Sequence, residues 1–400
     1  MFIHDLNCSW MNHPFARNRL KVENEEILKK ARGTGVKELY IDIALGLDVK
    51  AEPSGAAEAP AAAAPEEEKV EQERAPAEPS NFIPNVISRL SPAEEFQRAK
   101  ELYSNANRLV QGMMKDVRLG KQIELEQCEP LVDSIMDSMF RMPSALLPLA
   151  QMKSVDEYTF QHSVSVSALA VAFGRVMELP RKEIRELSLG GLLHDVGKAK
   201  VPGRILNKPG KLDDAEFVIM KSHAAYTTDL LKETPGISEV ALNAAAQHHE
   251  RFDGSGYPLG LKGDEISLHG QMLAIVDVYD AITSIRVYHK GMPPTEALRK
   301  LFEWSKTHFN PTLVQAFIKG IGIYPAGSLV RMESDRLGIV REVVPEKIMQ
   351  PVVQLVYDCK KACSLDPETV DLSASNDKIK SHEAYETWGL NQEKLVSVIA

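Results

Sequence analysis

The pattern of apolar and polar positions divides the chain into a helical centre and two ends with strand character. From about Ser91 to Lys319, apolar residues recur with the 3.6-residue period of a helix. After Gly322 the pattern changes to short alternating runs between turn residues, which predicts a small β extension. The centre should therefore hold the main core, with a β-rich appendage behind it.

Several helices can be placed from their start signals and apolar stripes. Segment 92–118 begins behind Ser91, a suitable N-cap, and segment 159–177 is apolar on most faces, as expected of a buried helix. The capping-box pair Asp213 and Glu216 predicts the start of the next long helix. Further helices are expected near 237–249, 267–286 and 295–304, and strands at 328–332, 338–344 and 352–357.

The helix expected at 214–233 should bury one apolar stripe, formed by Phe217, Met220, Ala224, Thr227 and Leu231. On the helix at 295–304, Phe302 and Trp304 are expected to join the core. These positions test how far periodicity alone assigns burial.

The N-terminal region has a different composition. Residues 1–48 combine a strand-like run, Leu39–Ile43, with a helical segment at Asn24–Arg32. Residues 51–80 contain ten Ala, five Pro and eight Glu, and Val70 is their one sizeable apolar side chain. Such a segment cannot bury enough surface to offset the entropy of ordering it, so it predicts a linker.

These observations predict a mainly α fold, with a helical central domain, a small N-terminal α+β domain and a small C-terminal β appendage. The expected parts are an accessory domain at 1–48, a disordered linker at 49–80, a helical connection at 81–145, the helical central domain at 146–320 and a β-rich extension at 321–400.

Composition narrows the class of protein. A chain of 400 residues with 44% hydrophobic and 26% charged residues is typical of a globular protein with more than one domain. The net charge is −9, but residues 51–80 account for −6 of it, so the remainder is close to neutral. Nucleic-acid binders are more often basic, and we expect neither DNA nor RNA as a partner.

The four cysteines are too few for a disulfide framework, and reduced thiols are expected, although Cys359 and Cys363 have a spacing that a metal could use. No apolar run reaches the length of a membrane helix, and the first residues lack the pattern of a signal peptide. A cytoplasmic protein without membrane contact is the resulting prediction.

Histidines and aspartates are concentrated at inward-facing or helix-end positions between 162 and 277. The set comprises His162, His194, Asp195, His223, His248, His249 and Asp277. Imidazole and carboxylate are ligands for iron, manganese, nickel or zinc where hydrolysis requires an activated water. A lone histidine on an apolar face is usually a hydrogen-bonded core residue, but five histidines and two aspartates at such positions favour a metal site.

The adjacent pairs within this set indicate more than one metal. Neighbouring side chains on a helix diverge by about 100°. Both members of His194-Asp195, or of His248-His249, can therefore hardly coordinate the same ion, but they can easily coordinate two neighbouring ions.

The same residues carry a resemblance to a known family. The run Gly191-Leu192-Leu193-His194-Asp195-Val196-Gly197-Lys198 resembles the HD signature of metal-dependent phosphohydrolases. The run from His248 to Pro258, HHERFDGSGYP, resembles the motif of the HD-GYP subfamily, and the match covers about 150–320. Segment 1–48, with the run SWMNHPF at 9–15, also looks like the small domain of unknown function often placed before HD-GYP domains.

This resemblance implies an all-helical bacterial phosphodiesterase that linearises cyclic di-GMP to pGpG, or further to GMP. It implies one divalent ion on His162, His194, Asp195 and Asp277, and a second on His223, His248 and His249, with Asp195 bridging them. Iron or manganese is expected, and nickel, cobalt or zinc would also suit these ligands.

The resemblance also suggests residues that act on the substrate. Lys198 follows the likely end of a helix, where a lysine is often a surface residue, but within the motif we favour contact with the scissile phosphate or the transition state. Substrate contacts are expected from Arg286, Tyr288 and Lys290. The family often has a second basic residue at the position that His289 holds here, directly before Lys290.

The Gly-Tyr-Pro loop can be read in two ways. It either turns the chain between two metal-bearing helices, or places Tyr257 at the substrate rim and offers a docking surface for diguanylate cyclase domains. A homodimer is a further expectation. The rival hypothesis for the whole protein is a receptor or adaptor that binds the dinucleotide and a partner protein with little turnover.

The number of metals can also be predicted. Family members with three metals resemble one another in having a Glu four residues before the first ligand histidine. Tyr158 holds that position here, and Glu157 is displaced by one residue. A tyrosine is a poor ligand for a hard cation because its reference pKa is near 10. We therefore predict two metals and pGpG as the main product.

Overall fold

The computed structural model describes residues 2–5, 20–21, 40–41, 91–151, 158–286, 289–344 and 347–399. The chain forms two compact units, Met1–Ile87 and Ser88–Ala400. In the first unit, strands β1 (Phe2–Asp5), β2 (Leu20–Lys21) and β3 (Tyr40–Ile41) form an antiparallel sheet in the order β2-β1-β3. The predicted helix at 24–32 and the predicted linker lie outside the described residues.

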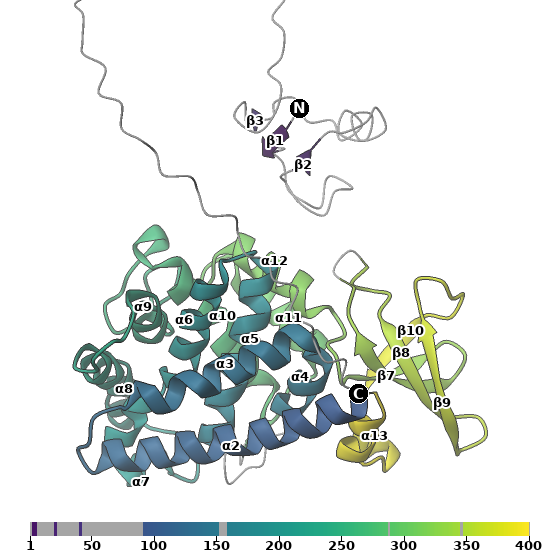
Figure 1. Cartoon of the computed structure of the whole chain (residues 1–400), viewed down its shortest axis with the longest axis horizontal. Coiled ribbons are helices and arrows are strands. Elements are labelled where there is room, and N and C mark those ends of the chain that lie inside the picture. Colours follow the sequence, from purple (N-terminus) through teal and green to yellow (C-terminus); the bar gives the residue numbers. More distant parts are fainter. Residues whose placement is uncertain are drawn as a thin grey trace, which may run out of the picture. The chain divides into compact units, whose positions relative to one another are not determined.

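The second unit is mainly helical and carries an antiparallel sheet near its C-terminal end (Figure 1), which confirms the predicted fold class. Its helices are α2 (Pro92–Arg118), α3 (Leu125–Arg141), α4 (Pro143–Gln151), α5 (Tyr158–Val176), α6 (Arg181–Leu193), α7 (Gly203–Leu206), α8 (Asp214–Lys232), α9 (Glu239–Gln247), α10 (Leu268–Thr283), α11 (Pro294–Trp304), α12 (Pro311–Ile321) and α13 (Gln392–Ile399). Short 3₁₀ turns include η2 (Val196–Lys200) and η3 (Gly263–Glu265).

Local signals in the sequence set the starts of two long helices. The Ser91 side chain accepts a hydrogen bond from the backbone N–H of Glu94, whose carboxylate accepts one from Ser91 N at 2.7 Å. Asp213 and Glu216 exchange the same pair of bonds at the start of α8. Both capping predictions are confirmed, and each satisfies backbone donors that a helix start would leave unpaired.

Helix α5 is the buried centre of the unit, as its apolar sequence predicts. Its side chains from Ser163 to Phe173 include a nearly continuous buried run, and it packs against α6, α10, α12 and α2. Gly191 permits the close approach of α6, because a Cβ at that position would lie 3.2 Å from the backbone of Ser167. This contact fixes the end of α6 beside α5, and both helices supply residues of the predicted site.

The C-terminal sheet contains more strands than its sequence predicts. Strands β6 (Leu329–Met332), β7 (Arg336–Glu342) and β8 (Val352–Asp358) match the expected runs, and β9 (Cys363–Asp371) and β10 (Ile379–Glu383) complete an antiparallel sheet in the order β10-β6-β7-β8-β9. Strand β9 was missed because most of its side chains are exposed, so it lacks the alternation that a half-buried strand shows.

Two aromatic residues differ from the periodicity-based prediction. Phe217 on α8 is 49% exposed and Phe302 on α11 is 43% exposed, although both were assigned to the core. Trp304 does pack against the core, and Ala224, Thr227 and Leu231 of the α8 stripe are buried. Helical spacing sets the direction of a side chain, but it does not determine whether a neighbouring element covers that part of the helix.

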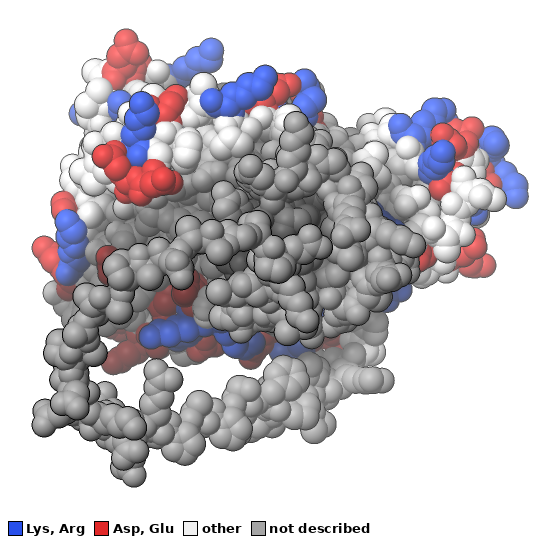
Figure 2. Space-filling view, turned by 90° about the horizontal axis from the view of Figure 1, so that it is seen from above, with Lys and Arg blue, Asp and Glu red and all other residues white. Residues whose placement is uncertain are grey.

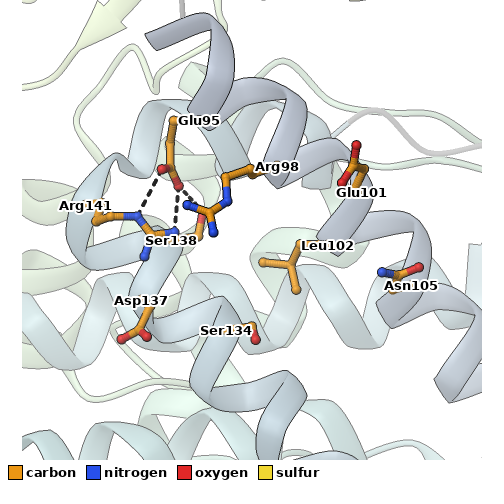
Figure 3. Close-up of a pocket in the computed structure, with 9 residues that line it drawn as sticks. All are labelled: Glu95, Arg98, Glu101, Leu102, Asn105, Ser134, Asp137, Ser138 and Arg141. Atoms are coloured by element: carbon orange, nitrogen blue, oxygen red, sulfur yellow. Dashed lines mark hydrogen bonds and ion pairs between the residues drawn. The ribbon is translucent and has the colours of Figure 1, made fainter. Parts of the chain in front are cut away.

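A separate polar pocket of about 310 Å³ lies between α2 and α3 (Figure 3). Glu95 is only 2% exposed there, and it accepts hydrogen bonds from Arg141 at 2.9 Å and from Ser138 at 3.3 Å. These bonds join the two helices. The residues lining the pocket include none of the predicted metal ligands.

Candidate metal centre and its surroundings

The structure brings the seven predicted ligands together from five regions of the helical unit. His162 lies on α5, His223 on α8 and Asp277 on α10, whereas His194-Asp195 and His248-His249 directly follow the ends of α6 and α9. Their ligand atoms form three overlapping groups within 4.8 Å: His223, His248 and His249; His162, His194 and Asp277; and His194, Asp195 and His248. The first two groups contain six of the seven residues, and the third group joins Asp195 to His194 and His248.

Three of the histidines are oriented by the same backbone contact. Nδ1 of His194, His223 and His248 donates to the carbonyl oxygen three residues earlier, at 2.7, 2.6 and 2.6 Å. This hydrogen bond fixes the proton on Nδ1 and directs the Nε2 lone pair into the cluster. In all three cases, the backbone carbonyl oxygen three residues earlier therefore positions the nitrogen that can bind a metal.

His162 is oriented by a carboxylate that the sequence analysis did not assign. Its Nδ1 donates to Oδ2 of Asp280 at 2.6 Å, and both side chains are 3% exposed. Asp280 follows Asp277 by three residues on α10, so both carboxylates lie on one face. The three-residue spacing of Asp277 and Asp280 was the sequence signal that could have identified Asp280 as part of the site. A carboxylate behind a ligand histidine fixes its ring and increases its basicity.

Replacing Asp280 by Asn should weaken metal binding by about 10- to 100-fold, because the amide retains the shape but not the charge behind His162. Competition with a chelator measures the affinity, and thermal unfolding reports whether the fold is retained. Asp264→Asn, at an exposed position of η3, is the matched control. An unchanged metal affinity in a folded Asp280→Asn protein would remove Asp280 from the site.

The two aspartates each face both sides of the cluster. Oδ2 of Asp195 lies 3.3 Å from His194 Nε2, while its Oδ1 lies 3.4 Å from His223 Nε2. Oδ1 of Asp277 lies 3.0 Å from His162 Nε2, and its Oδ2 lies 3.8 Å from His249 Nδ1. Asp195 is thus arranged as a bridging carboxylate would be.

Several ligand atoms of the cluster have unsatisfied or repulsive contacts, which a bound cation would relieve. Within the part of the chain that the structure describes, the buried atoms Asp195 Oδ1 and His248 Nε2 have no hydrogen-bond partner. His223 Nε2 and His249 Nε2 approach to 3.1 Å, and His162 Nε2 and His194 Nε2 to 3.2 Å. Buried unpaired acceptors are costly, and facing imidazole nitrogens repel unless a proton or a metal lies between them. The donor set therefore fits divalent metal ions.

The electrostatics of the cluster favour an ionised Asp195 and neutral side chains for His223, His248 and His249. Burial opposes the charge on Asp195, but His194 and Lys198 hold the pKa of this carboxyl well below its usual range. Burial lowers the pKa of His249 to about 3 and also lowers the pKa values of His223 and His248. Burial opposes the charge on His194 as well, yet Asp195 and Asp277 raise its pKa to about 10. Metal binding at His194 must displace this proton.

Lys198 lies beside the cluster in η2. Its Nζ donates to Oδ2 of Asp195 at 2.5 Å, and its side chain is 21% exposed. The ammonium can therefore reach both the site and solvent. This position agrees with either predicted role, contact with the scissile phosphate or stabilisation of the transition state.

The turn after α6 depends on a close contact with α8. Gly197 N donates to Thr227 Oγ1 at 3.0 Å, and this hydroxyl donates to the carbonyl oxygen of His194 at 2.9 Å. A Cβ on Gly197 would lie 2.1 Å from the carbonyl oxygen of His223, so only glycine fits. Thr227 was predicted as an apolar-stripe residue, and its hydroxyl in fact connects the two ligand-bearing segments.

The Gly-Tyr-Pro loop is held beside the cluster. Buried Glu250 accepts hydrogen bonds from Leu259 N at 2.8 Å and Leu261 N at 3.0 Å. The ring of Tyr257 packs on His249, with centroids 4.6 Å apart and an interplanar angle of 35°. Tyr257 therefore lies at the edge of the candidate centre.

The remaining predicted substrate contacts are described in part. Arg286 belongs to β4 (Ile285–Arg286) and Lys290 to β5 (His289–Lys290), and the two strands pair directly after α10. Tyr288 lies outside the described residues, as does Glu157, while Tyr158 is the first residue of α5.

Among the helices that the structure describes, none is long and apolar enough to cross a membrane.

The described surface seen from one side carries mixed charge. On the described part of the face shown in Figure 2, lysines and arginines are interspersed with aspartates and glutamates. A protein that binds nucleic-acid backbones typically gathers basic residues on one face. This face offers no such concentration.

Comparisons with known proteins agree with these motifs. Residues 144–313 match the HD domain, and residues 1–128 match DUF3391, a domain of unknown function. The chain is 41% identical over 391 residues to cyclic di-GMP phosphodiesterase PA4108 of Pseudomonas aeruginosa. The aligned region covers 97% of this chain and 90% of that protein.

Two shorter matches involve the catalytic region. A cyclic di-GMP phosphodiesterase of Thermotoga maritima is 35% identical over 46% of this chain and 50% of its own length. The 3'3'-cGAMP-specific phosphodiesterase 3 of Vibrio cholerae is 38% identical over 42% of this chain and 36% of its own length. Together with the motifs and the near full-length relative, these matches show that the chain belongs to the HD-GYP family of HD-domain phosphodiesterases, with a DUF3391 domain at its N-terminus.

Proposed function

We propose that this chain is a metal-dependent phosphodiesterase that hydrolyses cyclic di-GMP to linear pGpG in bacterial second-messenger signalling. The carrying observation is the arrangement of Asp195, which directs one carboxylate oxygen to each group of histidines. The near full-length relative named cyclic di-GMP phosphodiesterase supports the choice of substrate.

The ligand assignment follows the distances in the cluster. His162, His194, Asp195 and Asp277 would hold one divalent ion, and His223, His248 and His249 would hold the other, with Asp195 shared. Bound ions supply an acidified water and positive charge to balance the phosphoryl oxygens. Iron or manganese is the proposed metal, because neutral imidazoles and carboxylates suit both.

Other side chains would act on the substrate directly. Hydrolysis adds water across one phosphodiester bond, leaving a 5'-phosphate and a 3'-hydroxyl, and negative charge increases on the phosphoryl oxygens as the reaction proceeds. Lys198, whose Nζ lies 2.5 Å from Oδ2 of Asp195, would balance that charge. Tyr257, Arg286, Tyr288 and Lys290 are proposed to bind the dinucleotide, and docking of diguanylate cyclase domains and homodimer formation remain predictions.

The protein loaded anaerobically with iron or manganese should hydrolyse cyclic di-GMP, bind about two ions per chain and release mainly pGpG. Two ions are expected because Tyr158 begins α5 one turn before His162, where a third ion would need a carboxylate. Metal analysis gives the stoichiometry, and chromatography of the products separates pGpG from GMP.

Three outcomes would each contradict a different part of this proposal. Three ions per chain would refute the two-metal site, and GMP as the dominant product would refute the single cut. Tight binding of cyclic di-GMP without turnover by the fully loaded protein would instead favour the receptor or adaptor hypothesis.

A further inference from the structure

A mixed aromatic and cationic surface lies directly outside the candidate metal centre. Tyr257 packs on the ligand histidine His249 with ring centroids 4.6 Å apart. Nζ of Lys221 lies 5.6 Å from the centroid of Tyr257 and 5.2 Å from that of Phe217. The three side chains thus form a continuous row leading from the cluster to solvent, which we call the outer platform.

Two members of the outer platform are presented by the helix that also supplies a ligand. Phe217 and Lys221 lie one turn apart on α8, and His223 follows two residues later with its ring buried. Phe217 is 49% exposed, far more than a phenylalanine used only for packing. Among the side chains that the structure describes, none forms a salt bridge with Lys221. An exposed ring and an ammonium without a carboxylate partner are available to a ligand.

We propose that the outer platform binds one guanine base of the substrate and favours guanine over adenine; this inference rests on the proposed function. Phe217 would provide a stacking surface, and base–aromatic stacking stabilises binding for any base. Lys221 would provide selectivity, because guanine presents two acceptors, O6 and N7, on the edge where adenine presents an amino donor. An ammonium can donate to both acceptors of guanine, whereas adenine offers it N7 alone, beside an amino group that repels it.

The stacking role is tested with Phe217→Ala. This substitution should weaken binding of the bisphosphorothioate analogue of cyclic di-GMP to the metal-loaded protein by about five- to hundredfold. For cyclic di-GMP turnover, we expect the larger part of the loss in KM. Phe302→Ala is the matched control, since it removes another exposed phenylalanine, on α11. Equal affinities of wild type and Phe217→Ala would overturn the stacking role.

The selectivity role is tested with Lys221→Met, which retains the length of the side chain without its charge. The ratio of the affinities for the bisphosphorothioate analogues of cyclic di-GMP and cyclic di-AMP should fall about tenfold. Lys182→Met, at an exposed position of α6, should leave this ratio unchanged. A loss of affinity for both nucleotides by the same factor would show that Lys221 contributes only non-selective charge and would refute the selectivity.

Binding and turnover separate this inference from the proposed function. If the wild-type protein binds cyclic di-GMP without hydrolysing it, the proposed hydrolysis is refuted, and the two affinity ratios still decide the role of the outer platform. If it hydrolyses cyclic di-GMP while both variants bind as the wild type does, the outer platform is refuted and the hydrolysis stands. If it binds neither nucleotide, both proposals fail.

Discussion

Replacing Asp195 by Ala is expected to reduce the hydrolysis of cyclic di-GMP by at least about a thousandfold and to remove at least one of about two metal ions. Oδ1 and Oδ2 of this carboxylate face His223 and His194, so one substitution affects both ligand sets. His194→Ala should have nearly the same effect. Turnover assays and metal analysis on the same preparation measure both quantities.

Asp264→Ala serves as the control for loss of a carboxylate, because this residue of η3 is exposed and belongs to none of the ligand groups. Thermal unfolding of each variant checks that the fold is retained. If the Asp195 variant kept its full metal content and wild-type turnover, Asp195 would not be a ligand and the assignment of the centre would be wrong.

Replacing Lys198 by Ala is expected to lower kcat by about 100- to 1000-fold, with a much smaller change in substrate binding. The ammonium already lies 2.5 Å from Asp195, so it is close to the position where phosphoryl charge would develop. An interaction that strengthens as this charge grows contributes to the transition state more than to the bound substrate.

Lys200→Ala is the matched control, since this exposed lysine lies two residues further along η2. Steady-state assays separate kcat from KM, and metal analysis shows whether both ions remain bound. A Lys198 variant with wild-type kcat and normal metal content would make this residue a surface lysine that merely pairs with Asp195.

Local signals allowed much of the helical unit to be predicted. The capping boxes at Ser91 and Asp213 mark real helix starts, and the continuous apolar run of 159–177 is the buried helix α5. Each of these signals acts over a few residues, so the sequence near a helix is enough to predict where that helix starts or whether it is buried. The ends of α6 and α9 were predicted less closely: the sequence placed them just before Lys198 and at 249, whereas they precede His194 and His248.

Residues that act through distant partners could not be predicted in this way. Asp280 bonds to His162 across 118 positions of the sequence, and the hydroxyl of Thr227 bonds to the backbone of His194 across 33. Nothing near Thr227 distinguishes a connecting hydroxyl from a small buried side chain. Phe217 shows the opposite case, in which the helical stripe is real but the described residues leave this side chain 49% exposed.

The helix ends at the candidate centre have a consequence of their own. Helices α6 and α9 both end immediately before a ligand pair, so the negative ends of two helix dipoles lie against the cluster. Their fields attract a cation independently of any side-chain ligand. A variant that loses one carboxylate or imidazole retains this backbone contribution, so partial metal occupancy should persist where a site built from side chains alone would be empty.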